Sequence, residues 1–154
     1  MIVYRLLSVI VNVFCVFIAM VTVFLLLFAL ANPALLLQCF LMAAVVLYGW
    51  FANRFYVQVI VRKQTMTKKQ KDWLQVNAIV AFIFSVISII GIMVVVFNPE
   101  LIQEQLKQFE VQGNYSPSQF ASVAYVFLGI YLVLFIHIVW TYALIRKYKE
   151  YFAE

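Results

Sequence analysis

Four long uncharged runs of apolar residues dominate the chain, at residues 6–31, 33–53, 74–97 and 120–145. Each run reaches the roughly 20 residues that an α-helix needs to cross the hydrocarbon core of a bilayer. Apolar and polar positions do not alternate within the runs, so the strand pattern of a membrane β-barrel is absent. Because a helix satisfies its own backbone hydrogen bonds in lipid, the pattern predicts four transmembrane helices.

The first two runs are separated only by Asn32, and one helix through both would be about 70 Å long. That length is more than twice the thickness of the hydrocarbon core, so the chain must reverse. Asn32 and Pro33 mark the reversal, because proline disfavours helical geometry in the preceding residue and suits the first turn of the next helix. The first hairpin is therefore expected to be very tight.

Two capping boxes extend the later helices beyond their apolar runs. Thr67 with Gln70, and Ser116 with Gln119, have the spacing of an N-cap and its reciprocal partner. Pro117 favours the first position of the fourth helix. The pattern as a whole predicts an all-α integral membrane protein, a four-helix transmembrane bundle of two hairpins. Residues 1–154 then form a single membrane domain with spans at about 6–31, 33–61, 68–97 and 116–145.

The connection between the third and fourth runs contains the pattern of a short amphipathic helix, at about residues 99–110. Ile102, Leu106 and Phe109 recur at helical spacing, and polar residues occupy the other face. Such a helix is expected to lie flat on the outer membrane surface. Two roles stay open for it, a lid over the end of the bundle and a docking site for a partner.

Composition agrees with the membrane interpretation. The chain is 67% hydrophobic and 11% charged, with a mean hydropathy of +1.03, whereas soluble domains are roughly half apolar. A water-soluble fold is excluded, and 154 residues leave no room for a separate soluble catalytic domain. The net charge of +5 does not indicate nucleic acid, because most basic residues flank the apolar runs.

The basic residues predict the orientation. They gather at Arg5, within residues 62–71 and within residues 146–149, whereas the opposite side has only Lys107 and an uncharged turn. By the positive-inside rule the basic side faces the cytoplasm, with anionic head groups attracted to its loop. We expect a multi-pass protein of the cell membrane, of inner-membrane type, with both termini cytoplasmic. An aromatic belt marks the same boundary: Trp50, Tyr56, Trp73, Trp140, Tyr142 and Tyr148.

One processing alternative concerns the first helix. Ala29-Leu30-Ala31 resembles the cleavage site of a secretory signal peptide, and cleavage after Ala31 would leave three spans. The apolar run before it is about 25 residues long, whereas a signal-peptide core has about 7 to 15, and only one arginine precedes it. We therefore expect the first helix to be retained, with cleavage as the open alternative.

Few groups inside the runs carry chemistry. No Asp or Glu lies in any of the four, which argues against carboxylate-driven proton coupling. The chain resembles small four-helix multidrug exporters only in size and number of spans, because their transport depends on an intramembrane glutamate. His137 is the single histidine, which excludes bis-histidine haem, and with Cys15 and Cys39 it makes no recognisable zinc spacing. We expect no cofactor, no metal and no enzymatic activity.

Four residues form the candidate intramembrane polar site: His137, Arg54, Asn53 and Gln58. They fall at similar depth if both helices end at their basic clusters, and a pocket with no negative group would suit an anionic lipid or solute. The alternative for His137 is a neutral ring hydrogen-bonded to a neighbouring helix. The alternative for Arg54 is a side chain that snorkels to the head groups.

A helix-packing seam is predicted on the third helix, where small residues recur every three or four positions at Ala81, Ser85, Ser88 and Gly91. Small side chains let a neighbouring backbone approach closely. Whether the seam joins helices within one chain or between chains is open at this point.

The sequence therefore offers helix surfaces for packing rather than reactive side chains. We expect a small accessory or assembly subunit of a membrane complex, in contact with the lipid bilayer and with either a membrane-protein partner or further copies of itself. The alternative is a small oligomeric channel or transporter with its polar site at the level of His137 and Arg54.

Overall fold

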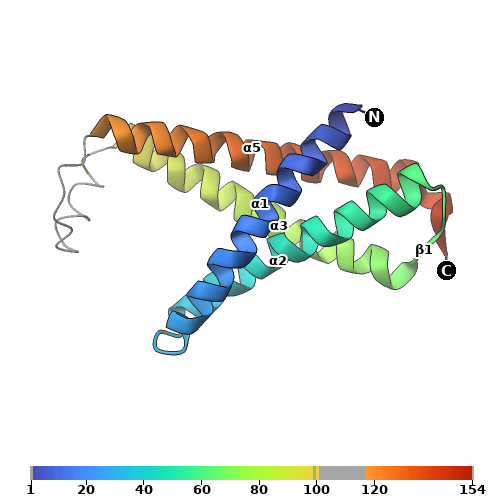
Figure 1. Ribbon diagram of the computed structural model, residues 1–154, viewed down its shortest axis with the longest axis horizontal. Helices are drawn as coiled ribbons and strands as arrows, with labels where there is room; N and C mark the ends of the chain where they lie inside the picture. Colours follow the sequence, from blue (N-terminus) through green and yellow to red (C-terminus); the bar gives the residue numbers. More distant parts are fainter. Residues whose placement is uncertain (1, 99, 101–116, 154) are drawn as a thin grey trace.

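The computed structural model describes residues 2–98, 100 and 117–153 (Figure 1). Four long helices account for most of this part of the chain: α1 (Ile2–Ala29), α2 (Ala34–Phe55), α3 (Lys68–Phe97) and α5 (Pro117–Lys147). Helix α2 continues directly into a π-helical turn, η1 (Tyr56–Val61). The four helical units are each long and apolar enough to cross a membrane. The prediction of an all-α membrane protein with four spans is confirmed.

The first hairpin is as tight as predicted. The backbone N–H groups of Ala31 and Asn32 both donate to the carbonyl of Phe28, at 3.1 and 3.2 Å, which closes the end of α1. Pro33 already has right-handed helical dihedrals, with φ −57° and ψ −25°, and α2 begins at the next residue. The two helices are thus joined by a turn of residues 30–33.

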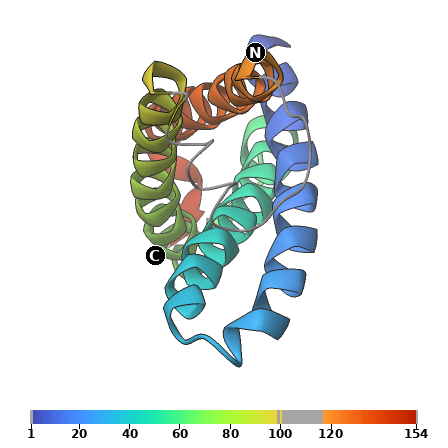
Figure 2. The same cartoon turned by 90° about the vertical axis from the view of Figure 1, so that its left-hand side faces the viewer.

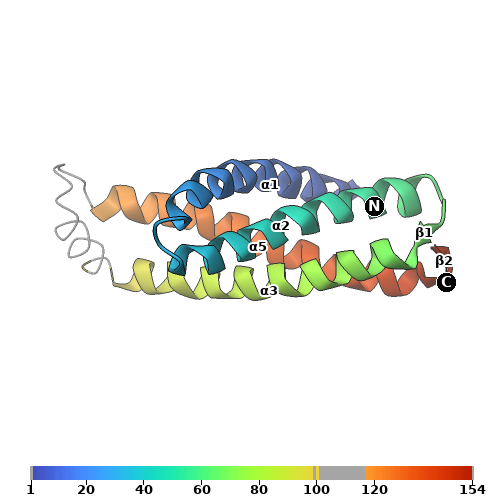
Figure 3. The same cartoon turned by 90° about the horizontal axis from the view of Figure 1, so that it is seen from below.

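The two hairpins diverge with distance from the chain termini. Figure 1 shows the α1–α2 turn well separated from the far ends of α3 and α5, whereas α2 and α5 come together toward the end that holds the C-terminus. Seen along the bundle, α5 bridges α3 and α1 (Figure 2). The α2–α3 connection and the C-terminus lie together at the converging end (Figure 3). We call this end, which carries Arg62, Lys63 and Arg146, the basic end.

The buried core lies mostly in the half of the bundle next to the basic end. Along α3 the buried residues extend only from Leu74 to Ser85. Along α5, all of the buried residues described except Ala124 lie between Leu134 and Ile145. The remaining faces carry exposed aliphatic and aromatic side chains, as expected for helices that contact lipid.

Helices α1 and α2 approach each other closely at Gly49. A Cβ atom built on Gly49 would overlap the Cys15 sulfur and lie 3.2 Å from the Cys15 Cβ, so only glycine fits. The Cys15 thiol donates to the Val45 carbonyl one turn earlier, at 3.5 Å. Both Cys15 and Cys39 are free and buried.

The C-terminal segment covers the α2–α3 connection at the basic end. After a short 3₁₀ helix, η2 (Lys149–Tyr151), strand β2 (Phe152–Ala153) pairs in parallel with β1 (Met66–Thr67). Met66 is fully buried, and the Phe152 ring stacks on Phe55 with 5.9 Å between ring centres. The basic end is therefore folded into a cap that joins residues more than 80 positions apart.

Helix α3 begins as the first capping box predicts. Thr67 is the N-cap, and its side chain accepts a hydrogen bond from the backbone N–H of Gln70 at 3.4 Å. The second box at Ser116 lies outside the described residues. The amphipathic helix predicted at about 99–110 also falls outside the continuously described chain.

The small residues of α3 divide between two environments. Ala81 and Ser85 are fully buried inside the bundle, and Ser88 is half-buried. A Cβ atom at Gly91 would meet nothing within 4 Å, because this residue lies in the diverging half. Most of the seam therefore packs within the chain.

Candidate functional site

Five polar side chains from three helices meet in the core near the basic end, and we call them the buried polar cluster. They are Tyr4 and Ser8 of α1, Tyr48 of α2, and His137 and Thr141 of α5. None of the five is more than 6% exposed. The burial is close to complete, so each polar atom needs a partner within the protein.

The cluster is built from two pairs of residues spaced four apart, Tyr4 with Ser8 and His137 with Thr141, so that each pair shares one helix face. The Ser8 hydroxyl donates to the Tyr4 carbonyl at 2.8 Å, and the Thr141 hydroxyl donates to the His137 carbonyl at 2.7 Å. Such bonds satisfy a hydroxyl within its own helix. The oxygen of each hydroxyl remains free to accept from another helix.

His137 is held from both sides. Its Nε2 lies 3.0 Å from the Ser8 hydroxyl and its Nδ1 lies 2.7 Å from the Tyr48 hydroxyl. The imidazole also stacks on the Tyr4 ring, with 4.9 Å between ring centres and 14° between planes. One side chain of α5 therefore ties α1 and α2 together.

Proton accounting is satisfied by a neutral His137. With the ring proton on Nε2, Nε2–H donates to the Ser8 oxygen, because the Ser8 hydroxyl gives its own proton to the Tyr4 carbonyl. Nδ1 is then the acceptor and receives the Tyr48 hydroxyl proton. Thr141 Oγ1 accepts from the Tyr4 hydroxyl at 3.0 Å and donates to the His137 carbonyl at 2.7 Å, and it lies 3.0 Å from the Tyr48 hydroxyl. A neutral His137 thus leaves no group of the cluster without a partner.

The hydrogen bonds of this cluster hold the helices together. Interhelical hydrogen bonds in lipid each contribute about 0.6 kcal/mol on average and up to about 1.7 kcal/mol. Among the described residues, no group of three or more His, Cys, Asp or Glu side chains gathers to hold a metal ion. The arrangement joins α1, α2 and α5 at the level where the bundle is best packed.

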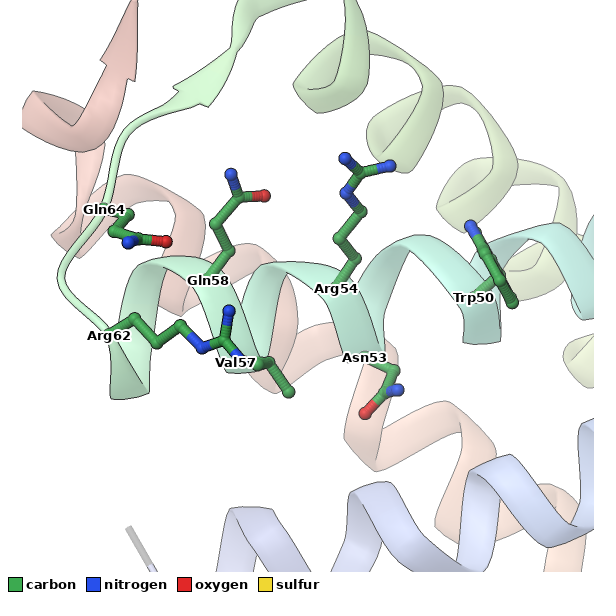
Figure 4. A pocket seen from close by; sticks show the side chains of 7 residues that line it. All are labelled: Trp50, Asn53, Arg54, Val57, Gln58, Arg62 and Gln64. Carbon is green, nitrogen blue, oxygen red and sulfur yellow. The ribbon is translucent and has the colours of Figure 1, made fainter.

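The other predicted site residues lie apart from His137. Asn53, Arg54 and Gln58 line an open pocket of about 400 Å³ on the outward side of α2 and η1 (Figure 4). The structure thus brings three of the four candidates together and leaves His137 in the core. Four further residues complete the pocket lining: Trp50, Val57, Arg62 and Gln64.

The sequence does not identify several of the residues in the pocket and in the buried polar cluster as site residues. By sequence alone, Arg62 and Gln64 are ordinary residues of a basic loop, and Trp50 belongs to the aromatic belt. Tyr4 and Thr141 read as isolated polar residues near the ends of apolar runs. The usable signal was the spacing of four on each helix, which places two polar groups on one face.

Together, the fold and these sites define a multi-pass membrane protein built as a four-helix bundle. No protein-family model matches the chain, and no curated protein or solved structure shows significant similarity to it.

Proposed function

We propose that the protein is a small accessory or assembly subunit of a membrane complex. The observation that carries the proposal is the uneven packing of the bundle. Its core lies mainly toward the basic end, and the other halves of α3 and α5 have little packed against them. A surface of this kind offers room for helices of another membrane protein.

An apolar groove marks the place where α1 turns away from α5. It has a volume of about 490 Å³, and five of its lining residues come from α1: Val9, Ile10, Val13, Phe14 and Phe17. Phe127 and Ile130 of α5 form the other wall. Helices associate in lipid through close van der Waals packing, because lipid tails are as apolar as the side chains themselves. A shaped groove supplies that packing better than a smooth helix face does.

The buried polar cluster supports an assembly role over transport. A transport site needs groups that can exchange their partners for a substrate or ion, and such groups face a cavity or a neighbouring path. The polar atoms of His137 are instead paired with Ser8 and Tyr48, which are themselves buried. This pairing supports a structural role for the histidine.

The proposed orientation places the basic end in the cytoplasm. Arg62 and Arg146 lie at this end, together with most of the lysines, which is the distribution that the positive-inside rule associates with the cytoplasmic side. A topology reporter fused at Glu110 is then expected to lie outside the cytoplasm. A cytoplasmic reading from that fusion would overturn the orientation.

Site-specific crosslinking tests the assembly role. A photo-crosslinking amino acid is placed in the groove at Val13 or Phe17, and at Val76 or Ile83 in the packed half of α3 as matched lipid-facing controls; all four positions are exposed in the bundle. The groove positions are expected to give one discrete adduct with a foreign membrane protein, which also copurifies stoichiometrically in mild detergent. Adducts with lipid only, or a pure homo-oligomer, would contradict the proposal, and the homo-oligomer would favour a channel or transporter.

A further inference from the structure

The pocket on α2 and η1 has one arginine on each side. Trp50, Arg54 and Gln58 follow one another at intervals of four, which keeps them on neighbouring turns of the helix. Arg62 would continue this row in an α-helix, because its N–H would bond to residue 58. In η1 the Arg62 N–H instead donates to the carbonyl of Val57, five residues back, at 3.0 Å.

The π-helical turn therefore moves Arg62 out of the row of Arg54. Figure 4 shows Arg54 and Gln58 extending on one side of the helix, and the Arg62 guanidinium folded back toward Val57 on the other. Asn53 lies on the same side as Val57. The guanidinium groups of Arg54 and Arg62 thus face the pocket from different sides of the helix. In a regular α-helix both would lie in the same row.

A strained turn completes the pocket. Lys63 has φ 55°, the only positive φ among the described residues, and this conformation costs about 1–2 kcal/mol for a residue with a Cβ. The turn lets the Gln64 N–H donate to the Gln58 carbonyl at 3.0 Å and lets Gln58 Nε2 donate to Thr65 O at 3.1 Å. The Lys63 ammonium lies 4.6 Å from the centre of the Tyr148 ring, so the cap helps to hold this conformation.

The charge and hydrogen-bonding groups of the pocket indicate its ligand. No acidic side chain lines it, whereas Arg54 and Arg62 offer the planar donors that bind phosphate oxygens. Gln58 Oε1 is buried and is the one buried side-chain N or O atom, among those the structure describes, with no hydrogen-bond partner. A buried acceptor without a partner calls for a donor such as a hydroxyl group.

The position of the pocket favours a lipid as the source of these groups. Trp50 is 68% exposed on the side toward the membrane interior, as indoles are at the interface, and Arg62 lies beyond Arg54 at the basic end. The pocket volume of about 400 Å³ exceeds that of a single phosphate ion and falls in the range of small-molecule sites.

We infer that this pocket binds the head group of an anionic phospholipid that carries both a phosphate and a free hydroxyl, as in phosphatidylglycerol. Arg54 and Arg62 attract the phosphate electrostatically from different sides of the helix, and Gln58 Oε1 accepts the head-group hydroxyl. A head-group ammonium is disfavoured beside two guanidinium groups. The inference stands apart from the assembly role, because it needs only the purified protein and lipid.

Native mass spectrometry of the detergent-purified protein with added lipid tests the inference. Phosphatidylglycerol is expected to bind at least tenfold more tightly than phosphatidylcholine with the same acyl chains. Arg54→Gln and Arg62→Gln are each expected to weaken phosphatidylglycerol binding about tenfold, or about 1.4 kcal/mol. Arg146→Gln, an equal charge change outside the pocket, is expected to change it less than twofold. An equal loss in Arg146→Gln, or no preference for the anionic lipid, would overturn the inference.

Two further experiments test whether the bound phosphate belongs to a lipid or to a soluble anion, and whether Gln58 binds the head-group hydroxyl. Inorganic phosphate at millimolar concentration is expected to leave lipid binding unchanged, and displacement by phosphate would show a site for a soluble anion instead. Gln58→Leu is expected to remove the preference for phosphatidylglycerol over phosphatidic acid, which has no head-group hydroxyl. Retention of that preference, in a variant whose thermal unfolding in detergent matches that of the wild type, would refute the role of Gln58.

Discussion

Replacing His137 with phenylalanine measures how strongly the buried polar cluster locks the helices. The change removes two hydrogen bonds, to Ser8 and to Tyr48, while an aromatic ring still stacks on Tyr4. Ser8 keeps its bond to the Tyr4 carbonyl, and Tyr48 can turn its proton toward Thr141, so neither hydroxyl is left alone. At about 0.6–1.7 kcal/mol for each lost bond, we expect a loss of about 1–3 kcal/mol in the free energy of unfolding.

A double-mutant cycle with Tyr48→Phe isolates the shared bond. Tyr48→Phe alone leaves His137 Nδ1 buried without a donor, at a cost of about 1–3 kcal/mol. Because each single variant already breaks the same bond, the double variant is expected to lose about 1 kcal/mol less than the sum. Tyr125→Phe, on an exposed face of α5, is the matched control and is expected to add independently to His137→Phe.

The assay is reversible unfolding in mixed micelles, followed by helical circular dichroism. If the losses in unfolding free energy caused by Tyr48→Phe and His137→Phe simply add in the double variant, the two side chains do not share a hydrogen bond. A His137→Phe variant with normal stability and normal abundance, but with a lost transport or growth phenotype, would refute the structural role of the histidine.

Other predictions follow from the packing. Gly49→Ala is expected to destabilise the α1–α2 pair by about 1–3 kcal/mol through overlap with the Cys15 sulfur, and Cys15→Ala in the same chain should recover part of that loss; unfolding in micelles that shows no recovery would contradict this contact. Phe152→Ala removes the ring that stacks on Phe55, so we expect faster amide exchange at the backbone N–H of Thr67, with unchanged exchange at the centre of α3 as the control. Intact-mass analysis of the membrane-inserted protein is expected to show that the first helix is retained, because α1 supplies two members of the buried polar cluster. A mass that matches a chain starting after Ala31 would show that the helix is cleaved off.

The number and length of the spans were predictable because insertion depends on local composition. An uncharged apolar run of sufficient length is stable as a helix in lipid whatever its neighbours are, so α1, α2, α3 and α5 were all expected from the sequence. The Thr67 cap and the reversal at Pro33 are local as well, since each involves residues within one or two turns of the helix.

The pairing of helix faces was decided by tertiary structure. Helices that are apolar on all sides carry no sequence pattern that marks an inner face, and contacts in lipid depend on shape and hydrogen bonds between distant residues. The sequence placed His137 at a depth shared with Arg54, but only the packing of α1 and α2 against α5 shows that Ser8 and Tyr48 are its partners. Small residues pointed to a seam on α3, whereas the close contact of α1 with α2 at Gly49 and Cys15 appears only in the structure.

The lining of the open pocket was predictable from the sequence only in part. The sequence by itself grouped Asn53, Arg54 and Gln58, because all three belong to the same stretch of one helix. Only the folded chain added Arg62 and Gln64, since a π-helical turn and a left-handed Lys63 redirect the backbone there. The left-handed Lys63 contacts the Tyr148 ring, and β1 pairs with β2 of the distant C-terminal segment, contacts that no local pattern predicts.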